Sequence, residues 1–195
     1  NPALLERLRP LSPMQRVDAM IHEIDEWYFA SRAPSRVNLS EPWSWYPRAR
    51  NMRRQFIFHC GPTNSGKTHH ALAALMKAPS GVYCAPLKAL ASQVCSTVNR
   101  NGVACDLLIG DERQFAGCAE HVACTIEMTP IEFQVDVAVV DEVQLIGDRD
   151  RGWAWTRAIL GLPAREIHVC GEARTLPLLK GLLSQTGEGR RLRVV

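Results

Sequence analysis

The sequence has no long apolar run, no Cys-x-x-Cys pair and few lysines. No uninterrupted apolar stretch approaches the roughly 18 residues that cross a bilayer, so no membrane span is predicted. The seven cysteines include no closely spaced pair of the kind that holds a structural zinc, and free thiols in a reducing compartment account for them. Only four of the basic residues are lysine, and a net charge of +3 is too small to indicate nucleic acid by itself.

One spacing, Cys118-x-x-His121-x-x-Cys124, still offers three potential metal ligands. A structural zinc site normally uses four ligands, and no partner pair exists elsewhere in the chain. We therefore expect no metal there.

What the chain does contain is an ordinary share of core-forming residues, 46% hydrophobic against 22% charged. A chain of 195 residues with this composition predicts one substantial domain with an appendage, or at most two small domains. Its character changes near residue 54. The sequence therefore predicts an N-terminal segment, residues 1–54, and a larger domain, residues 55–195.

The N-terminal segment begins with a helical pattern and continues as a Pro- and Ser-rich stretch. Ser12 is a plausible helix cap with Pro13 at the first helical position, and apolar residues follow at helical spacing. The stretch "RAPSRVNLSEPWSWYPRAR" then predicts an extended linker, whose Trp43 and Trp45 we expect to anchor it to the next domain. Four arginines close the segment, and a solvated linker is favoured over a phosphate-contacting patch: Arg48, Arg50, Arg53 and Arg54.

From Gln55 onward, short apolar runs alternate with segments of helical character such as His69–Met76 and Leu87–Asn99. Strands this apolar, with little alternation, favour a parallel sheet covered on both faces. The predicted fold is a doubly wound α/β domain. The predicted strands are Phe56–Cys60, Gly81–Ala85, Ala104–Ile109, Val122–Ile126, Val135–Val140, Glu166–Cys170 and one beginning near Arg191.

A phosphate-binding loop lies between the first strand and the first helix of this domain. Its spacing is Gly61-x-x-x-x-Gly66-Lys67-Thr68, in the strand–loop–helix context that the motif demands. Backbone amides at the helix N-terminus would converge on phosphate oxygens, Lys67 would reach the β- and γ-phosphates, and Thr68 would ligate Mg²⁺. The predicted nucleotide-binding residues are Gly61, Pro62, Thr63, Asn64, Ser65, Gly66, Lys67 and Thr68.

A second motif, "VDVAVVDEVQ", is an apolar strand that ends in two adjacent carboxylates, Asp141 and Glu142. Charges at such a place are costly unless they are used. We expect Asp141 to hold Mg²⁺ and Glu142 to orient and deprotonate an attacking water. Together the two motifs predict an active site for a nucleoside triphosphate, in which Lys67, Glu142 and Gln144 are the catalytic candidates.

Three classes of protein remain open at this point. Helicases of superfamily two carry Asp-Glu-x-His or close variants, and here the fourth residue is Gln144. Cellular thymidine kinases also pair a similar loop with Asp-Glu-x-Gln, but they add a zinc-binding cysteine lobe that this chain lacks. A non-catalytic P-loop module is the third class, and the joint presence of Lys67, Thr68, Asp141 and Glu142 argues against it.

Two tryptophans and two histidines near these motifs are expected to have structural and not catalytic roles. Trp153 and Trp155 are expected to pack as anchors on the helix after Asp150, and His69 and His70 are expected at the surface or in packing contacts.

Several blocks, in order, resemble the RNA helicase subunit of the mitochondrial degradosome and its bacterial relatives. The blocks are "WYPRARNMRRQFIFHCGPTNSGKT", "SGVYCAPLKALA", "GVACDLLIGDER", "CTIEM", "VAVVDEVQLIGDRDRGWAWTRAILGL" and "IHVCGEA". They cover roughly residues 43–190, and "RGWAWTRAILGL" is the most diagnostic of them. The resemblance implies the first RecA-like domain of an ATP-dependent RNA helicase of superfamily two.

The resemblance also implies where nucleic acid would bind. Segments matching the family's nucleic-acid motifs contain Pro86, Lys88, Thr125 and Glu127, which would grip the sugar–phosphate backbone without reading bases, and Arg113 would add charge. The residue matching the end of the Asp-Glu motif, Gln144, links the γ-phosphate site to these contacts. The family's coupling motif falls at Gly171 and Glu172; the sequence there reads "GEARTLPLL", with Ala173 where better-known members have proline.

Such a helicase hydrolyses ATP between two RecA-like domains, and the second supplies an arginine finger. No Gln-x-x-Gly-Arg-x-x-Arg pattern of that second domain is present, so we expect this chain to be the first motor domain of a longer protein. No adenine-reading glutamine motif precedes Gly61, so nucleotides other than ATP are expected to serve as well. The expected partners are single-stranded RNA or DNA, the second RecA-like domain and an exoribonuclease, in the mitochondrial matrix of a eukaryote or the cytoplasm of a bacterium.

Overall fold

The computed structural model of the chain describes residues 40–61, 66–110, 112–117 and 119–195. The helix predicted near Ser12, most of the N-terminal segment, and Pro62–Ser65 of the phosphate-binding loop lie outside these residues. One compact unit of the chain, which contains the sheet and both candidate sites, runs from Trp43 to Val195. Within the described residues, no helix combines the length and apolarity that a membrane crossing requires.

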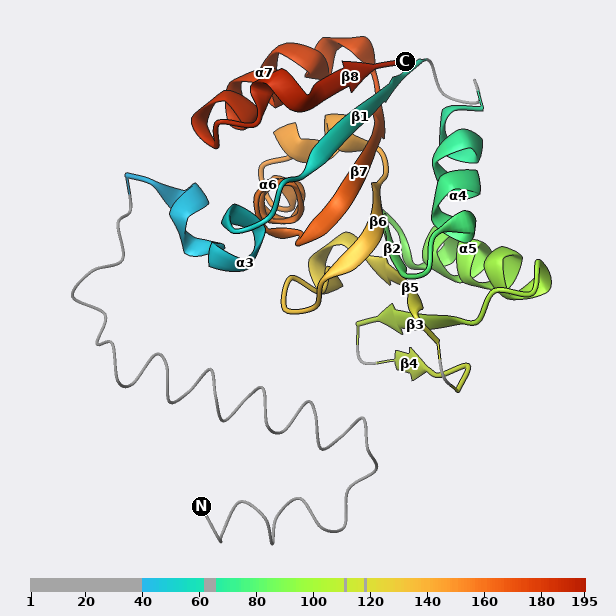
Figure 1. The fold of residues 1–195 in the computed structure, drawn as a ribbon. Coiled ribbons are helices and arrows are strands. Elements are labelled where there is room, and N and C mark those ends of the chain that lie inside the picture. Colours follow the sequence, from blue (N-terminus) through green and yellow to red (C-terminus); the bar gives the residue numbers. More distant parts are fainter. Residues whose placement is uncertain (1–39, 62–65, 111, 118) are drawn as a thin grey trace, which may run out of the picture. The chain divides into compact units, whose positions relative to one another are not determined.

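A single eight-stranded sheet, mostly parallel, forms the centre of this unit (Figure 1). The strand order is β4-β3-β5-β2-β6-β7-β1-β8, and only the edge strand β4 runs antiparallel to its neighbour. The strands are β1 (Gln55–Cys60), β2 (Gly81–Ala85), β3 (Cys105–Ile109), β4 (Glu112–Gln114), β5 (His121–Thr125), β6 (Val135–Val140), β7 (Ala164–Gly171) and β8 (Leu192–Val194). The predicted parallel α/β fold is confirmed.

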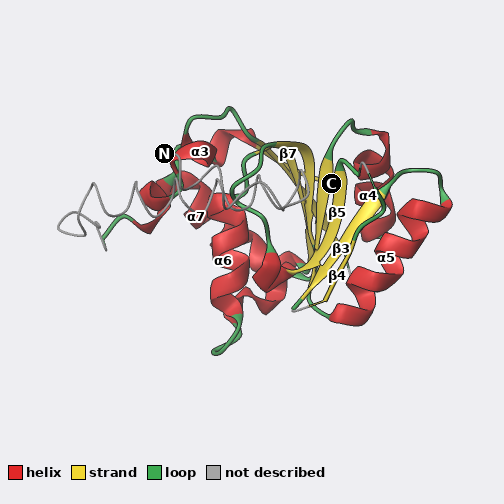
Figure 2. Ribbon diagram, turned by 90° about the horizontal axis from the view of Figure 1, so that it is seen from below, coloured by secondary structure: helices red, strands yellow, loops and turns green. Residues whose placement is uncertain are grey.

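Helices cover both faces of the sheet, with α4 and α5 on one side and α6 and α7 on the other (Figure 2). The helices and 3₁₀ turns are η2 (Pro42–Trp45), α3 (Pro47–Arg50), α4 (Lys67–Lys77), α5 (Lys88–Arg100), η3 (Ile126–Met128), η4 (Val143–Gly147), α6 (Gly152–Gly161), η5 (Ala173–Thr175), α7 (Leu176–Gln185) and η6 (Gly189–Arg191). Two layers of helix around one sheet make the arrangement doubly wound.

The apolar strands divide their side chains between two cores, one on each face of the sheet. Phe56 and Phe58 of β1 belong to the core under α6 and α7, whereas Tyr83 of β2 belongs to the core under α4 and α5. Because both faces are buried, central strands such as β2 lack polar alternation. The same alternation places His121 and Ala123 on one face of β5 and Cys124 on the other, so His121 and Cys124 do not converge on a metal.

The predicted solvated linker before β1 is wrong for the described part of that segment. Residues 42–50 form η2 and α3 instead of an extended chain, and Arg54 is fully buried. Residues 43–54 also fall in the same compact unit as the sheet, although their composition groups them with the N-terminal segment. The physical reason is that three of the four arginines find acceptors in the domain: Arg48 donates to the Glu132 carbonyl at 2.6 Å, and Arg50 and Arg54 donate to Glu188.

Arg54 makes a forked ion pair with Glu188. Its Nε donates to Glu188 Oε1 at 2.8 Å, its Nη2 donates to Glu188 Oε2 at 2.6 Å, and its Nη1 donates to the carbonyls of Ile159 and Leu162 at the end of α6. Arg50 adds a bond to Glu188 at 3.2 Å. These contacts join the start of β1, the end of α6 and the turn after α7.

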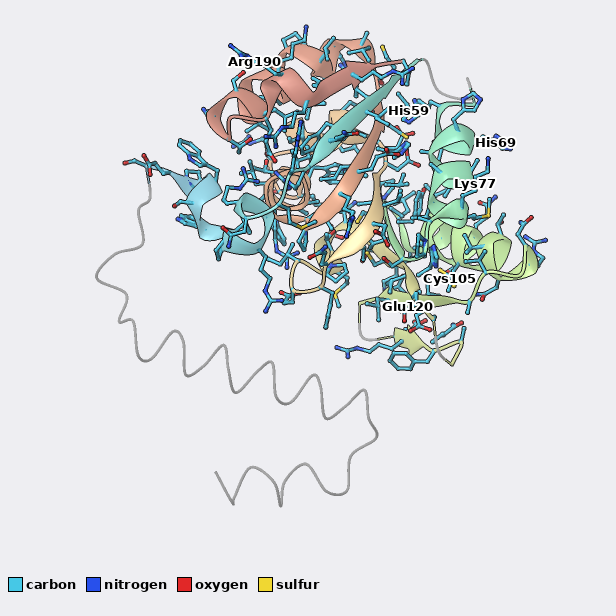
Figure 3. The ribbon with its side chains drawn as sticks, viewed as in Figure 1. His59, His69, Lys77, Cys105, Glu120 and Arg190 are labelled. Atoms are coloured by element: carbon cyan, nitrogen blue, oxygen red, sulfur yellow. The ribbon has the colours of Figure 1, made fainter. Side chains whose placement is uncertain are left out.

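Two tryptophans on α6 have different surroundings. Trp155 is fully buried, as expected of a packing anchor, but Trp153 is 55% exposed, so the expectation for Trp153 is wrong. His69 and His70 are exposed, and Figure 3 shows His69 on the outer side of α4.

The parallel register brings the carboxyl ends of the central strands to one edge of the sheet. Cys60 pairs with Gly171, Ala85 with Thr125, and Cys84 with Val140. The segments at the ends of these strands carry the phosphate-binding loop, the Asp-Glu motif, Pro86 and Lys88, Glu127, and Glu172, and ligands bind at this edge in open α/β sheets.

Candidate nucleotide and nucleic-acid site

The phosphate-binding loop leaves β1 at Gly61 and enters α4 at Lys67. Gly66 caps the helix in the left-handed conformation, with φ of 82°, which glycine adopts at no steric cost. The largely buried Lys67 side chain turns back over the loop, and its Nζ donates to the Gly61 carbonyl at 3.2 Å. The described part of the loop thus directs an ammonium group and a helix N-terminus to the same place, the arrangement that receives phosphate.

Asp141 lies next to this helix, at the end of β6, and is only 5% exposed. The Thr68 hydroxyl donates toward its carboxylate oxygens at 3.3 and 3.4 Å, and the Tyr83 hydroxyl donates to Oδ2 at 2.8 Å. Burial raises the pKa of the Asp141 carboxyl, and hydrogen bonds from Tyr83 and from the Glu142 amide offset this only in part. Burial and the Asp141 charge both raise the pKa of Tyr83, so Tyr83 remains a donor.

These residues fit a magnesium ion. No arginine or lysine in the described part of the chain forms an ion pair with Asp141, whose carboxylate accepts hydrogen bonds from Tyr83, Thr68 and the Glu142 amide. A carboxylate and a hydroxyl in contact, beside a phosphate-binding loop, are the oxygen ligands that Mg²⁺ takes in such sites.

Glu142 and Gln144 lie in the turn that comes after Asp141 in the chain, and their side chains contact each other. Glu142 has φ of 50°, the one positive value among the described residues other than glycine, so its backbone is held in an unfavourable conformation. The side-chain amide of Gln144 donates to Glu142 Oε2, whereas Gln144 Oε1 is buried and finds no partner among the described residues. Strain and an unsatisfied buried acceptor cluster where function is expected.

Gly171 allows the turn after Glu142 to approach β7 closely. A Cβ at Gly171 would lie 2.5 Å from Val143 Cγ1 and 3.0 Å from Gln144 Oε1, so any side chain would displace the turn. Glu172 follows at the surface, where it forms an ion pair with Arg174 at 2.6 Å.

Four of the five predicted nucleic-acid residues line a common pocket of about 350 Å³, which we call the Pro86 groove. Its lining residues are Pro86, Leu87, Lys88, Gly110, Thr125, Glu127, Met128 and Arg151. The fifth predicted residue, Arg113, lies on the edge strand β4 and is not part of this lining. Leu87 is 56% exposed, so the groove presents apolar surface beside the Lys88 ammonium.

Arg151 is a charged residue of the groove that the sequence did not predict as a site residue. Its Nη2 donates to the Pro86 carbonyl at 2.7 Å, and its Nε donates to Glu127 Oε1 at 2.7 Å. It therefore joins the segment after β2 to the turn after β5. Arg151 opens the block "RGWAWTRAILGL", but the sequence assigned it no role, because its partners lie 65 and 24 residues away along the chain.

A phosphate-binding loop, a buried acid at the end of a neighbouring strand and a doubly wound parallel sheet define a P-loop NTPase domain of the RecA-like class. The DEXQ-box helicase domain of Suv3 matches residues 42–194, and the chain belongs to this family. The four letters of that name correspond to Asp141, Glu142, Val143 and Gln144.

Relatives confirm this membership. The chain is 52% identical over 155 residues to the "ATP-dependent RNA helicase SUV3 homolog, mitochondrial" of Drosophila pseudoobscura pseudoobscura, covering 77% of this chain and 20% of the relative. It is 48% identical over 167 residues to the "ATP-dependent RNA helicase SUV3L, mitochondrial" of Oryza sativa subsp. japonica, covering 86% of this chain and 23% of the relative. The chain thus spans about a fifth of the length of these relatives.

A solved structure of a variant of Dbp5 from S. cerevisiae, bound to Nup159, Gle1, IP6 and ADP, has a TM-score of 0.53 and 14% identity. The match covers 88% of this chain and 51% of that one, and it supports the fold. The predicted RecA-like domain and the predicted family are both confirmed, and membership in a helicase family decides against the thymidine kinase-like alternative.

Proposed function

We propose that this chain is the nucleotide-binding motor domain of an ATP-dependent RNA helicase and works as one half of an ATPase site. The observation that carries the proposal is the buried Asp141 carboxylate, which contacts Thr68 of the loop helix and lies on the same sheet edge as the Pro86 groove. A site for nucleotide and a site for a single strand then share one edge, as a motor that converts hydrolysis into movement requires.

Each residue at the nucleotide site has a role in this proposal. The loop from Gly61 to Gly66 holds phosphates with its amides, Lys67 binds the β- and γ-phosphates, and Thr68 and Asp141 hold Mg²⁺. When bound, Mg²⁺ neutralises charge on the phosphate oxygens. Glu142 accepts a proton from the attacking water, and the Gln144 amide keeps the Glu142 carboxylate in place.

The Pro86 groove binds the strand. Pro86, Lys88, Thr125 and Glu127 contact sugar and phosphate, and the exposed Leu87 adds apolar contact, so binding would be sequence-tolerant and weakened by salt. Arg113 adds charge from the edge strand. Gly171 and Glu172 report the state of the γ-phosphate to this surface through the closely packed turn at Val143 and Gln144.

Residues outside this chain would complete the ATPase site. A second RecA-like domain supplies an arginine finger, and closure of the two domains on one strand, followed by reopening after hydrolysis, moves the motor. RNA is the proposed strand, with DNA as a second substrate and nucleotides other than ATP accepted. The named relatives are mitochondrial, so we place a eukaryotic protein in the matrix and a bacterial one in the cytoplasm, beside an exoribonuclease.

The test is steady-state ATPase activity of the full-length protein, with and without single-stranded RNA. We expect RNA to stimulate hydrolysis and Glu142→Gln to lower the rate roughly 10²–10⁴-fold, the usual contribution of a general base. Glu120→Gln, a surface glutamate outside both sites, is the matched control and keeps the wild-type rate. No stimulation by RNA or DNA would contradict the helicase assignment, and full activity of Glu142→Gln would contradict the role of Glu142.

A further inference from the structure

Arg151 and Trp155, at the start of α6, connect the Pro86 groove to the acid of the nucleotide site. Arg151 holds the Pro86 carbonyl and the Glu127 carboxylate, each at 2.7 Å. Its guanidinium carbon lies 5.7 Å from the centroid of the Trp155 ring. The indole Nε1 of Trp155 then donates to the backbone carbonyl of Asp141 at 2.9 Å.

Hydrogen bonds to Asp148 also hold the backbone at Arg151 and Gly152 in place. Asp148 Oδ1 accepts from the Arg151 amide at 2.8 Å, and the Gly152 amide donates to the Asp148 carbonyl at 3.0 Å. A Cβ at Gly152 would lie 2.2 Å from the Ile146 carbonyl oxygen, so the start of α6 is pressed against the η4 turn that follows Glu142. These contacts form a continuous path from the Pro86 groove, through Arg151 and Trp155, to the backbone of Asp141.

We propose that Arg151 and Trp155 are positioning residues that couple strand binding in the Pro86 groove to nucleotide binding at Asp141. The inference rests on the function proposed above. A phosphate in the groove competes with Glu127 for the Arg151 guanidinium, and any shift of that group alters its stacking on Trp155. Trp155 is fully buried and cannot move without changing its hydrogen bond to the Asp141 backbone.

This route is separate from the one through Gly171, because it runs through α6, which packs against Ile146, whereas Gly171 packs against Val143 and Gln144. Coupling between two ligands is reciprocal, so nucleotide must change RNA affinity by the same factor by which RNA changes nucleotide affinity. The ratio of the RNA Kd without nucleotide to the RNA Kd with nucleotide therefore measures the coupling directly.

The test uses the full-length protein and fluorescence anisotropy of a labelled single-stranded RNA. RNA Kd is measured without nucleotide and with a non-hydrolysable ATP analogue plus Mg²⁺. We expect the wild-type ratio of the two Kd values to be at least about fivefold. Arg151→Gln and Trp155→Phe should bring the ratio toward one, and the double variant should lower it no further than either single change, because the two residues act in series.

The controls use the same side-chain types on the same segment. Arg149→Gln and Trp153→Phe alter exposed residues that do not line the groove, and they should keep the wild-type ratio. Arg151→Lys keeps the charge without the two-pronged hydrogen bonding, and as a partly exposed position it should fold normally. Arg151→Lys should also lower the ratio of the two Kd values. The test therefore remains decisive even if Trp155→Phe is unstable.

The outcomes separate the two proposals. Wild-type protein that does not bind RNA overturns the proposed function. Wild-type coupling that survives in the Arg151 and Trp155 variants overturns the inference alone. An equal loss of RNA affinity with and without nucleotide also overturns it, since that result shows binding or packing without coupling.

Discussion

Glu188 and Asp141 are both acids buried in the same unit, at 4% and 5% exposure, yet their surroundings are opposite. Burial alone would raise the pKa of Glu188, but hydrogen bonds and charge from Arg54 outweigh it and lower that pKa. Burial raises the pKa of Asp141, which has hydroxyl and amide donors but forms no ion pair with an arginine or lysine among the residues that the structure describes. A buried acid with a matched arginine holds the fold together, whereas we propose that the buried acid without one binds a metal ion.

The largest expected effect concerns the first of these acids. Glu188→Gln leaves the fully buried Arg54 guanidinium without its counter-charge, and we expect a loss of about 3–5 kcal/mol in the free energy of unfolding. Urea unfolding of the purified chain measures it. Glu172→Gln is the control, because its ion pair with Arg174 is exposed and should be worth less than about 1 kcal/mol. Equal effects of the two changes would remove the distinction between these acids.

The pH dependence should have opposite signs for the two acids. The lowered pKa of Glu188 means that its stabilisation is present above its unfolded value and is lost as pH falls, so wild type and Glu188→Gln converge in acid. The raised pKa of Asp141 means that ionising it costs stability as pH rises. Asp141→Asn should therefore be more stable than wild type at neutral pH, on the order of 1 kcal/mol, with the gap closing below about pH 4.

Chemical denaturation between roughly pH 3 and 8, without nucleotide or Mg²⁺, measures both differences. A wild-type chain more stable than Asp141→Asn at neutral pH would show that Asp141 already has a compensating partner.

Changes at two glycines are expected to have smaller effects than Glu188→Gln. Gly171→Ala places a methyl group 2.5 Å from Val143 and should destabilise the unit by about 1–3 kcal/mol while slowing hydrolysis in the full-length protein. Gly181→Ala on α7, where a Cβ meets nothing within 4 Å, should stabilise it by about 0.5–1 kcal/mol. Thermal unfolding and ATPase rates distinguish the two, and a harmless Gly171→Ala would contradict the close packing described for the turn.

The sequence predicted the sheet well, because the signals of its strands are local, whereas the roles assigned to the nucleotide-site residues stay predictions. Gly81–Ala85 is an apolar run, Val135–Val140 is apolar apart from Asp136, and both form strands with those bounds. Gly66, Lys67 and Asp141 belong to motifs in which neighbours in the sequence are neighbours in the site. The edge strand β4 was missed because its three residues are exposed and carry no apolar signal.

The contacts that were missed depend on partners far away in the chain. Arg54 looked like part of a solvated cluster because Glu188 lies 134 residues later. Arg151 was overlooked for the same reason, and Trp153 was grouped with Trp155 because the letters alone do not show which side of α6 faces the core. Charge pairing and side-chain orientation follow from the tertiary fold.

Mg²⁺-dependent nucleotide binding tests the central distinction most directly. Isothermal titration of the full-length protein with ATP, with and without Mg²⁺, is compared among wild type, Asp141→Asn and Glu188→Gln. We predict that Mg²⁺ tightens ATP binding by about tenfold or more in wild type and in folded Glu188→Gln, and that Asp141→Asn loses this gain. A full Mg²⁺ effect in Asp141→Asn would contradict the account.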